Sequence, residues 1–140
     1  MNETTADSDK RIVEEIVREM ASSKSGAQFT SHWANDALWF NVPPFASRGV
    51  SPAKDFFDKF FANVASCQVD FLEIDVMLRG TMAVVCSVQR VNIVLKAGGT
   101  ESMVARETDC FEKGPTGWEL IHQHASVPAR GTWDGKIVQG

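Results

Sequence analysis

Hydrophobic residues near the start of the chain recur at every third or fourth position, which is the spacing of a helix with one buried face. This pattern starts at Asp9 and predicts a helix that Ser8 or Asp9 caps and that Gly26 ends. A short second helix is predicted over residues 27–34. The polar residues 1–8 are expected to form a flexible N-terminus.

A third helix is predicted to start at Ser51 and Pro52, because serine is a good cap and proline fits the first helical turn. Its apolar face carries four phenylalanines at helical spacing: Phe56, Phe57, Phe60 and Phe61. Aromatic rings in this arrangement need a concave apolar partner. We therefore expect this helix to close one wall of a pocket, with Phe56 or Phe57 touching the ligand.

The second half of the chain alternates between apolar and polar residues, which is typical of strands with one buried face. Four strands joined by glycine-containing turns are predicted, over residues 69–79, 82–96, 100–112 and 118–127. An earlier strand is predicted over residues 36–42. Together these elements indicate an α+β fold, with N-terminal helices in the concave face of a curved antiparallel sheet. One domain is expected over residues 9–128, followed by a C-terminal tail over 129–140.

Composition limits the possible classes of function. The chain has 140 residues, a hydrophobic content of 44% and a formal net charge of −4, which fits one domain with a real core. The lack of a basic run argues against nucleic-acid binding, and no apolar stretch is long enough to span a membrane. Three cysteines without metal-type spacing are expected to be reduced thiols, which predicts a cytoplasmic protein.

The last predicted strand carries most of the candidate chemistry. Strict alternation places four residues on one of its faces: Leu120, His122, His124 and Ser126. Two imidazoles and a hydroxyl on one face indicate that this face lines a polar site. The two histidines would bind a metal only with a third ligand such as His32, so no metal is predicted.

Turn lengths predict which side chains meet across the strands. A tight turn in the last hairpin places Asp109 opposite His122. The same register places Glu107 opposite His124, and the preceding hairpin adds Arg90 beside Glu107. We interpret these pairs as catalytic, because a carboxylate fixes the tautomer of an imidazole and raises its basicity. The alternative interpretation is a structural ion network.

A β-bulge would change this register. One extra residue would present Arg106, Thr108 and Cys110 at the site in place of Glu107 and Asp109. We base the candidate site on the register without a bulge. The predicted catalytic residues are then His122, Asp109, His124 and Glu107. The predicted substrate-binding residues are Arg90, Asn41, Trp39, Phe56, Phe57, Ser126, His32 and Arg106.

The run Arg-x-Thr-Asp…Gly-Trp-x-x-x-His-x-His-x-Ser-x-Pro, within residues 106–128, resembles the C-terminal hairpin of SnoaL-like proteins. These belong to the nuclear transport factor 2-like superfamily, with the ketosteroid isomerases and the association domain of calcium/calmodulin-dependent kinase II. Arg48-Gly49 and the run from Asp36 to Phe40 extend the resemblance. It implies a cystatin-like α+β fold shaped as a cone-like barrel, with a pocket for small, often cyclic molecules.

The resemblance to ketosteroid isomerases covers one of their three catalytic positions. Asp109 stands where that family has its protonated aspartate. Asn41 replaces the proton-abstracting aspartate, and the chain contains no tyrosine to donate to an oxyanion. Steroid isomerisation by that mechanism is therefore not predicted.

Two classes of function remain. The first is a cofactor-independent acid/base enzyme, of isomerase, cyclase, dehydratase or hydrolase type, that acts on a small cyclic or hydrophobic metabolite. The second is a non-catalytic ligand-binding or oligomerisation module. In either class we expect a homodimer through the outer face of the last strand, which would carry Glu119, Ile121, Gln123, Ala125 and Val127.

Overall fold

The computed structural model describes residues 3–41 and 46–127. Its helices are α1 (Thr5–Ala21), α2 (Gly26–Phe29) and α3 (Val50–Asn63). Its strands are β1 (Trp33–Phe40), β2 (Ala46–Arg48), β3 (Val64–Arg79), β4 (Met82–Leu95), β5 (Thr100–Gly114) and β6 (Gly117–Ser126). The predicted tail over residues 129–140 lies outside the described residues.

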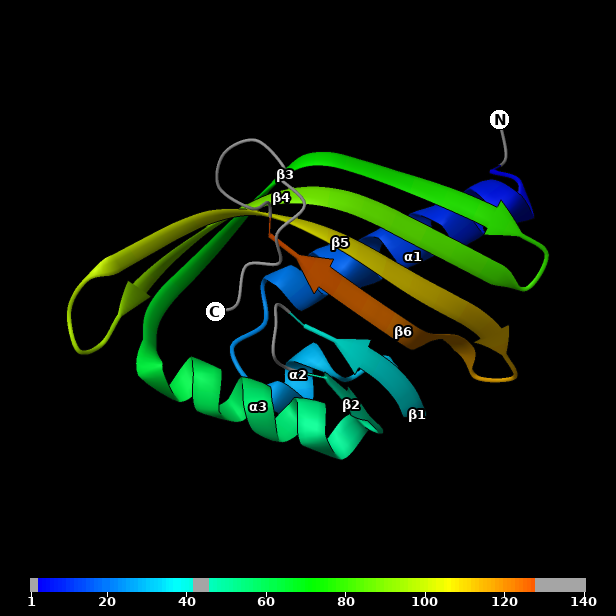
Figure 1. Ribbon diagram of the computed structural model, residues 1–140. Coiled ribbons are helices and arrows are strands. Elements are labelled where there is room, and N and C mark those ends of the chain that lie inside the picture. Colours follow the sequence, from blue (N-terminus) through cyan, green and yellow to red (C-terminus); the bar gives the residue numbers. More distant parts are fainter. Residues whose placement is uncertain (1–2, 42–45, 128–140) are drawn as a thin grey trace, which may run out of the picture.

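The strands form one curved sheet in the order β2-β1-β6-β5-β4-β3, and the helices lie under its concave side (Figure 1). The predicted α+β class is confirmed. The sheet is open, because β2 and β3 are its edges and do not pair with each other. It is also not wholly antiparallel, since β1 runs parallel to β6. We call the side that faces the helices the inner face and the opposite side the outer face.

The helices differ from the prediction mainly at their ends. Helix α1 begins at Thr5, where the side chain of Thr4 accepts a hydrogen bond from the backbone of Asp7. Residues 5–8, which were predicted to lie in a flexible N-terminus, therefore form the first turn of α1. Helix α2 ends at Phe29, because the chain from Trp33 onward pairs in the sheet. The described part of the chain has no helix that is long and apolar enough to cross a membrane.

Gly26 allows α2 and α3 to pack in close contact. A Cβ atom at this position would lie 2.1 Å from the backbone oxygen of Lys54. The backbone N–H of Gly26 donates a hydrogen bond to Oδ1 of Asp58 at 2.8 Å. Any larger residue would force the helices apart, and α3 carries the phenylalanines of the predicted pocket wall.

The β5–β6 hairpin contains an extra residue that reverses the facing of β6. Its strands pair in the predicted register from the turn as far as Phe111 and Leu120. The next pair joins Cys110 to His122, so Ile121 forms a β-bulge. Because side chains alternate along a strand, the later side chains of β6 point to the face opposite the one predicted.

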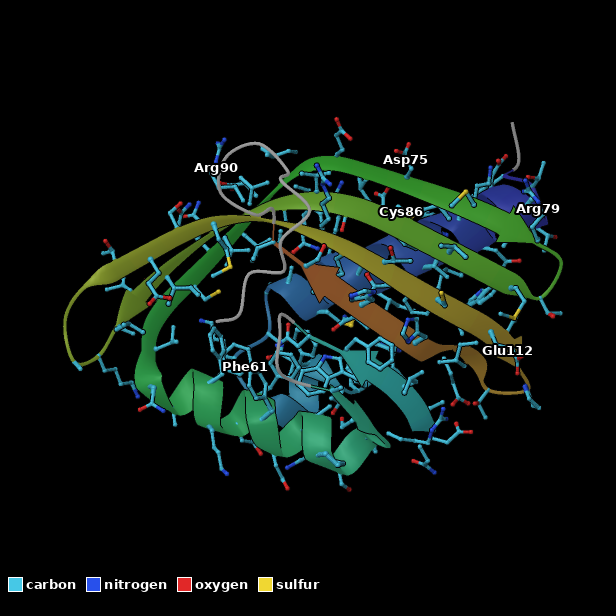
Figure 2. All side chains as sticks on the ribbon, in the orientation of Figure 1. Phe61, Asp75, Arg79, Cys86, Arg90 and Glu112 are labelled. Carbon is cyan, nitrogen blue, oxygen red and sulfur yellow. The ribbon has the colours of Figure 1, made fainter. Side chains whose placement is uncertain are left out.

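The register of the β4–β5 hairpin also differs from the prediction. Its loop shifts the pairing by an odd number of residues, so that Arg90 pairs with Val104 and Ser87 pairs with Glu107. Arg90 is exposed and points away from the helices, whereas Phe61 lies between α3 and the sheet (Figure 2). The predicted pairing of Arg90 with Glu107 is therefore wrong, and Arg90 lies outside the inner face.

A buried carboxylate joins the start of α1 to the β5–β6 hairpin. Oδ1 of Asp9 accepts hydrogen bonds from Nε1 of Trp118 at 3.1 Å and from Nζ of Lys113 at 3.0 Å. These two bonds, first that from Trp118, lower the pKa of Asp9. The ionised carboxylate is thus the form that stabilises this contact.

We predict that Asp9→Asn lowers the melting temperature at neutral pH. We also predict that the melting temperature of this variant changes less with pH in the acidic range. The pKa of Asp9 lies below its ordinary value of 3.8. Its stabilising contribution is therefore complete above that value and is lost as the pH falls through the lowered pKa. Thermal unfolding followed by circular dichroism across the acidic range measures both effects. The matched control is Asp7→Asn, an exposed position in the same helical turn, and an equal effect of the two variants would contradict the prediction.

Candidate functional site

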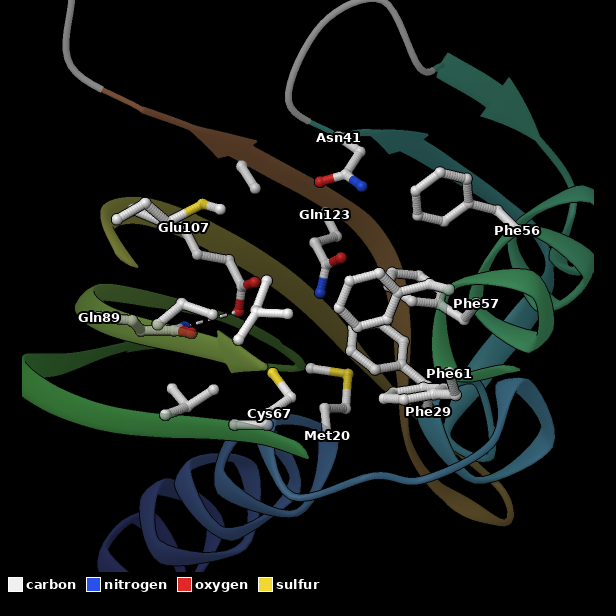
Figure 3. A pocket seen from close by; sticks show the side chains of 18 residues that line it. Met20, Phe29, Asn41, Phe56, Phe57, Phe61, Cys67, Gln89, Glu107 and Gln123 are labelled. Atoms are coloured by element: carbon white, nitrogen blue, oxygen red, sulfur yellow. Dashed lines mark hydrogen bonds between the residues drawn. The ribbon is translucent and has the colours of Figure 1, made fainter. Parts of the chain in front are cut away.

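A cavity of about 290 Å³ lies between the inner face of the sheet and the helices (Figure 3). This volume is at the small end of the range of about 300–1,000 Å³ for ligand pockets. One wall is aromatic and comes from α2 and α3. The opposite wall comes from the strands and carries the polar groups Gln89, Glu107 and Gln123.

The aromatic wall consists of side chains held in fixed positions by contacts between their rings. The rings of Phe29 and Phe57 are stacked with centroids 3.8 Å apart. Trp39 lies behind them, with its ring 5.1 Å from that of Phe56 and 5.5 Å from that of Phe57. Phe56 and Phe57 both line the cavity, as the helical pattern predicted, whereas Trp39 is only 2% exposed and belongs to the core.

The polar wall is a connected set of hydrogen bonds on β4, β5 and β6. Nε2 of Gln89 donates to Oγ of Ser87 at 2.9 Å and to Oε2 of Glu107 at 3.1 Å. Nε2 of Gln123 donates to Oδ1 of Asp109 at 2.8 Å. The bulge at Ile121 explains this arrangement, because it turns Gln123 inward, opposite Asp109.

Asp109 is fully buried, and its second oxygen, Oδ2, has no hydrogen-bond partner among the described residues. Burial raises the pKa of Asp109 well above its ordinary value of 3.8, and the neighbouring Glu107 carboxyl group raises it further. With this raised pKa, the carboxyl group of Asp109 holds its proton to a higher pH than an exposed aspartate does. A proton on Oδ2 supplies a donor for a hydrogen bond to Glu107, which two ionised carboxylates lack.

The two histidines lie on the outer face, away from the cavity. His122 pairs with Cys110 and His124 with Thr108. Nδ1 of His122 lies 2.8 Å from the backbone oxygen of Leu38 and donates to it, because a carbonyl group only accepts. The predicted pairs of Asp109 with His122 and of Glu107 with His124 are therefore wrong. The bulge separates the carboxyl groups from the imidazoles by placing them on opposite faces.

Other candidate residues are divided between the two faces. Arg106 and Ser126 pair with each other on the outer face, beside the histidines. His32 is partly exposed, with Nε2 3.6 Å from Oε2 of Glu19, and it does not line the cavity. Asn41 does line the cavity and is half-buried, as predicted for a residue that contacts a ligand.

Three polar residues of the inner face were not among the predicted site residues: Ser87, Gln89 and Gln123. Strict alternation along the last predicted strand placed Gln123 on the outer face. Alternation cannot reveal an extra residue earlier in the strand, which reverses the facing of the side chains after it. A signal was available in β4, where small and polar residues stand next to apolar ones along the strand. This pattern does not distinguish a strand face that lines a pocket from a strand face that is exposed to solvent.

The comparisons with known proteins agree with this architecture. A family model described as SnoaL-like domain matches residues 13–130. The chain belongs to the SnoaL-like domain family. No curated protein matches the sequence of this SnoaL-like protein.

Solved structures of low sequence identity share its fold. A nuclear transport factor 2 (NTF2-like) superfamily protein from Salmonella enterica serovar Typhimurium superimposes with a TM-score of 0.83 at 19% identity, over 95% of this chain and 100% of the other. A candidate dehydratase of the NTF2-like family from Streptomyces avermitilis has a TM-score of 0.78 at 17% identity, over 88% and 99% of the two chains.

A candidate calcium/calmodulin-dependent protein kinase II association domain from Xanthomonas campestris is also similar. Its TM-score is 0.74 at 17% identity, and the match covers 92% of this chain and 91% of the other. At these identities the likeness shows the fold alone. The same SnoaL-like fold is thus found in proteins assigned to different functions, which is common for widely used folds.

We predict that the free energy of unfolding falls less with rising pH in Asp109→Asn than in the wild type. The folded state holds the proton of Asp109 above the pH at which the unfolded chain releases it. As the pH rises from the ordinary pKa of 3.8 towards the raised folded value, the wild type therefore loses up to about 1.4 kcal/mol of unfolding free energy per pH unit.

The asparagine variant keeps a neutral side chain with a donor, so its stability should fall less over the same range. Urea unfolding at a series of pH values measures the difference in slope. Asp75→Asn, an exposed position on β3, is the control and should run parallel to the wild type. Parallel curves for wild type and Asp109→Asn would contradict the assignment of a protonated Asp109.

Proposed function

We propose that this SnoaL-like protein is a small-molecule enzyme that works by proton transfer, with Glu107 as the group that meets the substrate. The observation that carries the proposal is a pair of carboxyl groups on the inner face of the sheet. Glu107 lines an otherwise largely apolar cavity, and Asp109 is fully buried next to it with an unpartnered oxygen. A carboxyl group with a strongly perturbed pKa, as at Asp109, is typical of functional sites.

The two carboxyl groups have different roles in this proposal. Glu107 removes a proton from the substrate, while Asp109 acts as a positioning residue that donates a hydrogen bond to Glu107 and stabilises its charge. Gln89 holds Oε2 of Glu107 at 3.1 Å, so that Oε1 remains for the substrate. Returning the proton to another carbon atom gives an isomerisation, and returning it to a departing hydroxyl group gives a dehydration with release of water.

The surroundings of the pair suit a hydrophobic substrate. The phenylalanines of α2 and α3 bind flat apolar groups, and their low dielectric strengthens interactions with charge. Asn41 lies at the same cavity and supplies an amide for a polar group of the substrate. The candidate dehydratase among the similar structures supports this class of chemistry without identifying a substrate.

We predict that Glu107→Gln slows proton exchange by about 10²–10⁴-fold, the usual contribution of a general base. The probe is 2-tetralone, a small bicyclic ketone whose C–H groups beside the carbonyl exchange with deuterium when a base removes their protons. Proton NMR in heavy water measures the rate with each protein. Glu101→Gln, an exposed position on the same strand, is the matched control and should exchange as fast as the wild type. Exchange by the wild type no faster than in buffer would contradict the proposed proton transfer.

We also propose that the protein forms a homodimer, through a revised outer face. Gln123 and Ala125, which were expected there, point inward and are buried. The outer face of β4 and β5 instead carries half-buried apolar residues, among them Val84, Val88 and Val104. A second copy would cover these side chains around a two-fold axis. A candidate kinase association domain is among the structures that share this fold, and it supports a non-catalytic association module as the alternative function.

We predict that Val88→Glu converts the dimer to a monomer, because a charge in the centre of an apolar interface is costly to bury. Sedimentation velocity at micromolar concentration measures the change. Thr81→Glu in the exposed β3–β4 turn is the control and should remain dimeric. A wild type that sediments only as a monomer would rule out the dimer.

The thiols support a reducing, cytoplasmic location for the protein. All three cysteines, Cys67, Cys86 and Cys110, are free. Disulfides are favoured only in oxidising compartments, so free thiols on neighbouring strands fit the cytoplasm. This location remains a proposal.

A further inference from the structure

Among the described residues that line the cavity, Glu107 is the only one with a formal charge. Glu107 forms no ion pair with a basic residue in the described part of the chain, and its contact at Oε2 is the neutral amide of Gln89. A carboxylate in apolar surroundings is costly unless an opposite charge compensates it. Within residues 3–41 and 46–127, no basic side chain supplies that charge at the cavity.

The polar wall presents acceptors to the cavity. Both N–H groups of the Gln89 amide are used, one by Ser87 and one by Glu107, which leaves its oxygen. Nε2 of Gln123 donates one of its two N–H groups to Asp109. The carboxylate of Glu107 and the amide oxygen of Gln89 therefore favour a ligand group that donates hydrogen bonds.

The opposite wall is also suited to a cation. Five phenylalanines line the cavity: Phe29, Phe56, Phe57, Phe60 and Phe61. Figure 3 shows Phe57 and Phe61 across the cavity from Gln89 and Glu107. The faces of aromatic rings attract ammonium groups, and their apolar surface buries the attached hydrocarbon.

From the lone carboxylate, the acceptor groups and the ring-lined wall we infer that the ligand is a hydrophobic amine, bound as its ammonium ion with an N–H directed at Oε1 of Glu107. This inference deepens the proposed function and rests on it in one respect, that Glu107 faces the ligand. The described lining residues disfavour a carboxylate ligand, because none of them is a cation that could receive it. The cavity volume of about 290 Å³ suits a molecule with one or two rings.

The test compares three probes on one bicyclic frame, measured by isothermal titration calorimetry: 2-aminotetralin, 2-tetralol and tetralin-2-carboxylate. They differ in charge and hardly in shape, and the amine is protonated at neutral pH. We expect the wild type to bind the amine at least about tenfold more tightly than the alcohol. We expect no binding of the carboxylate.

Glu107→Gln keeps the shape of the side chain and removes its charge. It should reduce the preference for the amine to near unity, while Glu101→Gln should preserve it. The comparison of amine with alcohol in the wild type needs no variant, so a variant that fails to fold leaves the inference testable.

The outcomes separate the inference from the proposed function. Equal binding of amine and alcohol, with 2-tetralone still exchanging its protons, would overturn the inference and leave the enzyme proposal standing. Tighter binding of the amine that depends on Glu107, without exchange, would support the inference and overturn the proposed catalysis. If none of the probes binds and no exchange occurs, both are wrong.

Discussion

The facing of β6 depends on one backbone irregularity, the extra residue Ile121. Before it, Trp118 and Leu120 point inward and pack in the core beneath α1. After it, Gln123 and Ala125 occupy the inner face. Without the bulge, the imidazoles would enter the cavity and Gln123 would not reach Asp109. The chemistry of the site thus follows from a single unpaired residue, which agrees with the frequent occurrence of bulges beside active sites.

The inner face carries hydrogen-bonded polar residues within an otherwise apolar cavity lining. Burying these polar groups costs free energy. Because the pKa of Asp109 is raised in the folded state, the folded state loses stability as the pH rises above the ordinary value of 3.8. The hydrogen bond from Gln123 offsets part of the cost of burial, and the packed phenylalanines hold the opposite wall in place. A buried group that lowers stability and is yet well positioned fits a functional role better than a structural one.

The two faces of the sheet carry different kinds of residues because alternation separates them. The carboxyl groups lie inside with the cavity, and His122 and His124 lie outside beside Phe40, whose ring is 5.4 Å and 5.7 Å from theirs. The proposed binding and proton transfer on the inner face can therefore vary independently of the proposed association through the outer face. This separation gives one fold room for both enzymes and assembly modules.

The sequence by itself determined the α+β class, the positions of the helices and long strands, and the phenylalanine wall, and it singled out Asp109 and Glu107 as candidate site residues. These features follow from the periodicity of apolar residues and from the turn residues. Both can be recognised within short segments of the sequence. Only the tertiary structure decided the bulge at Ile121 and the parallel pairing of β1 with β6. In that pairing Leu38 lies beside His122, so the register of β6 is fixed on one side by its hairpin partner β5 and on the other by β1, which is distant in sequence. Such long-range packing has no local signature, which is why alternation alone assigned the histidines to the wrong face.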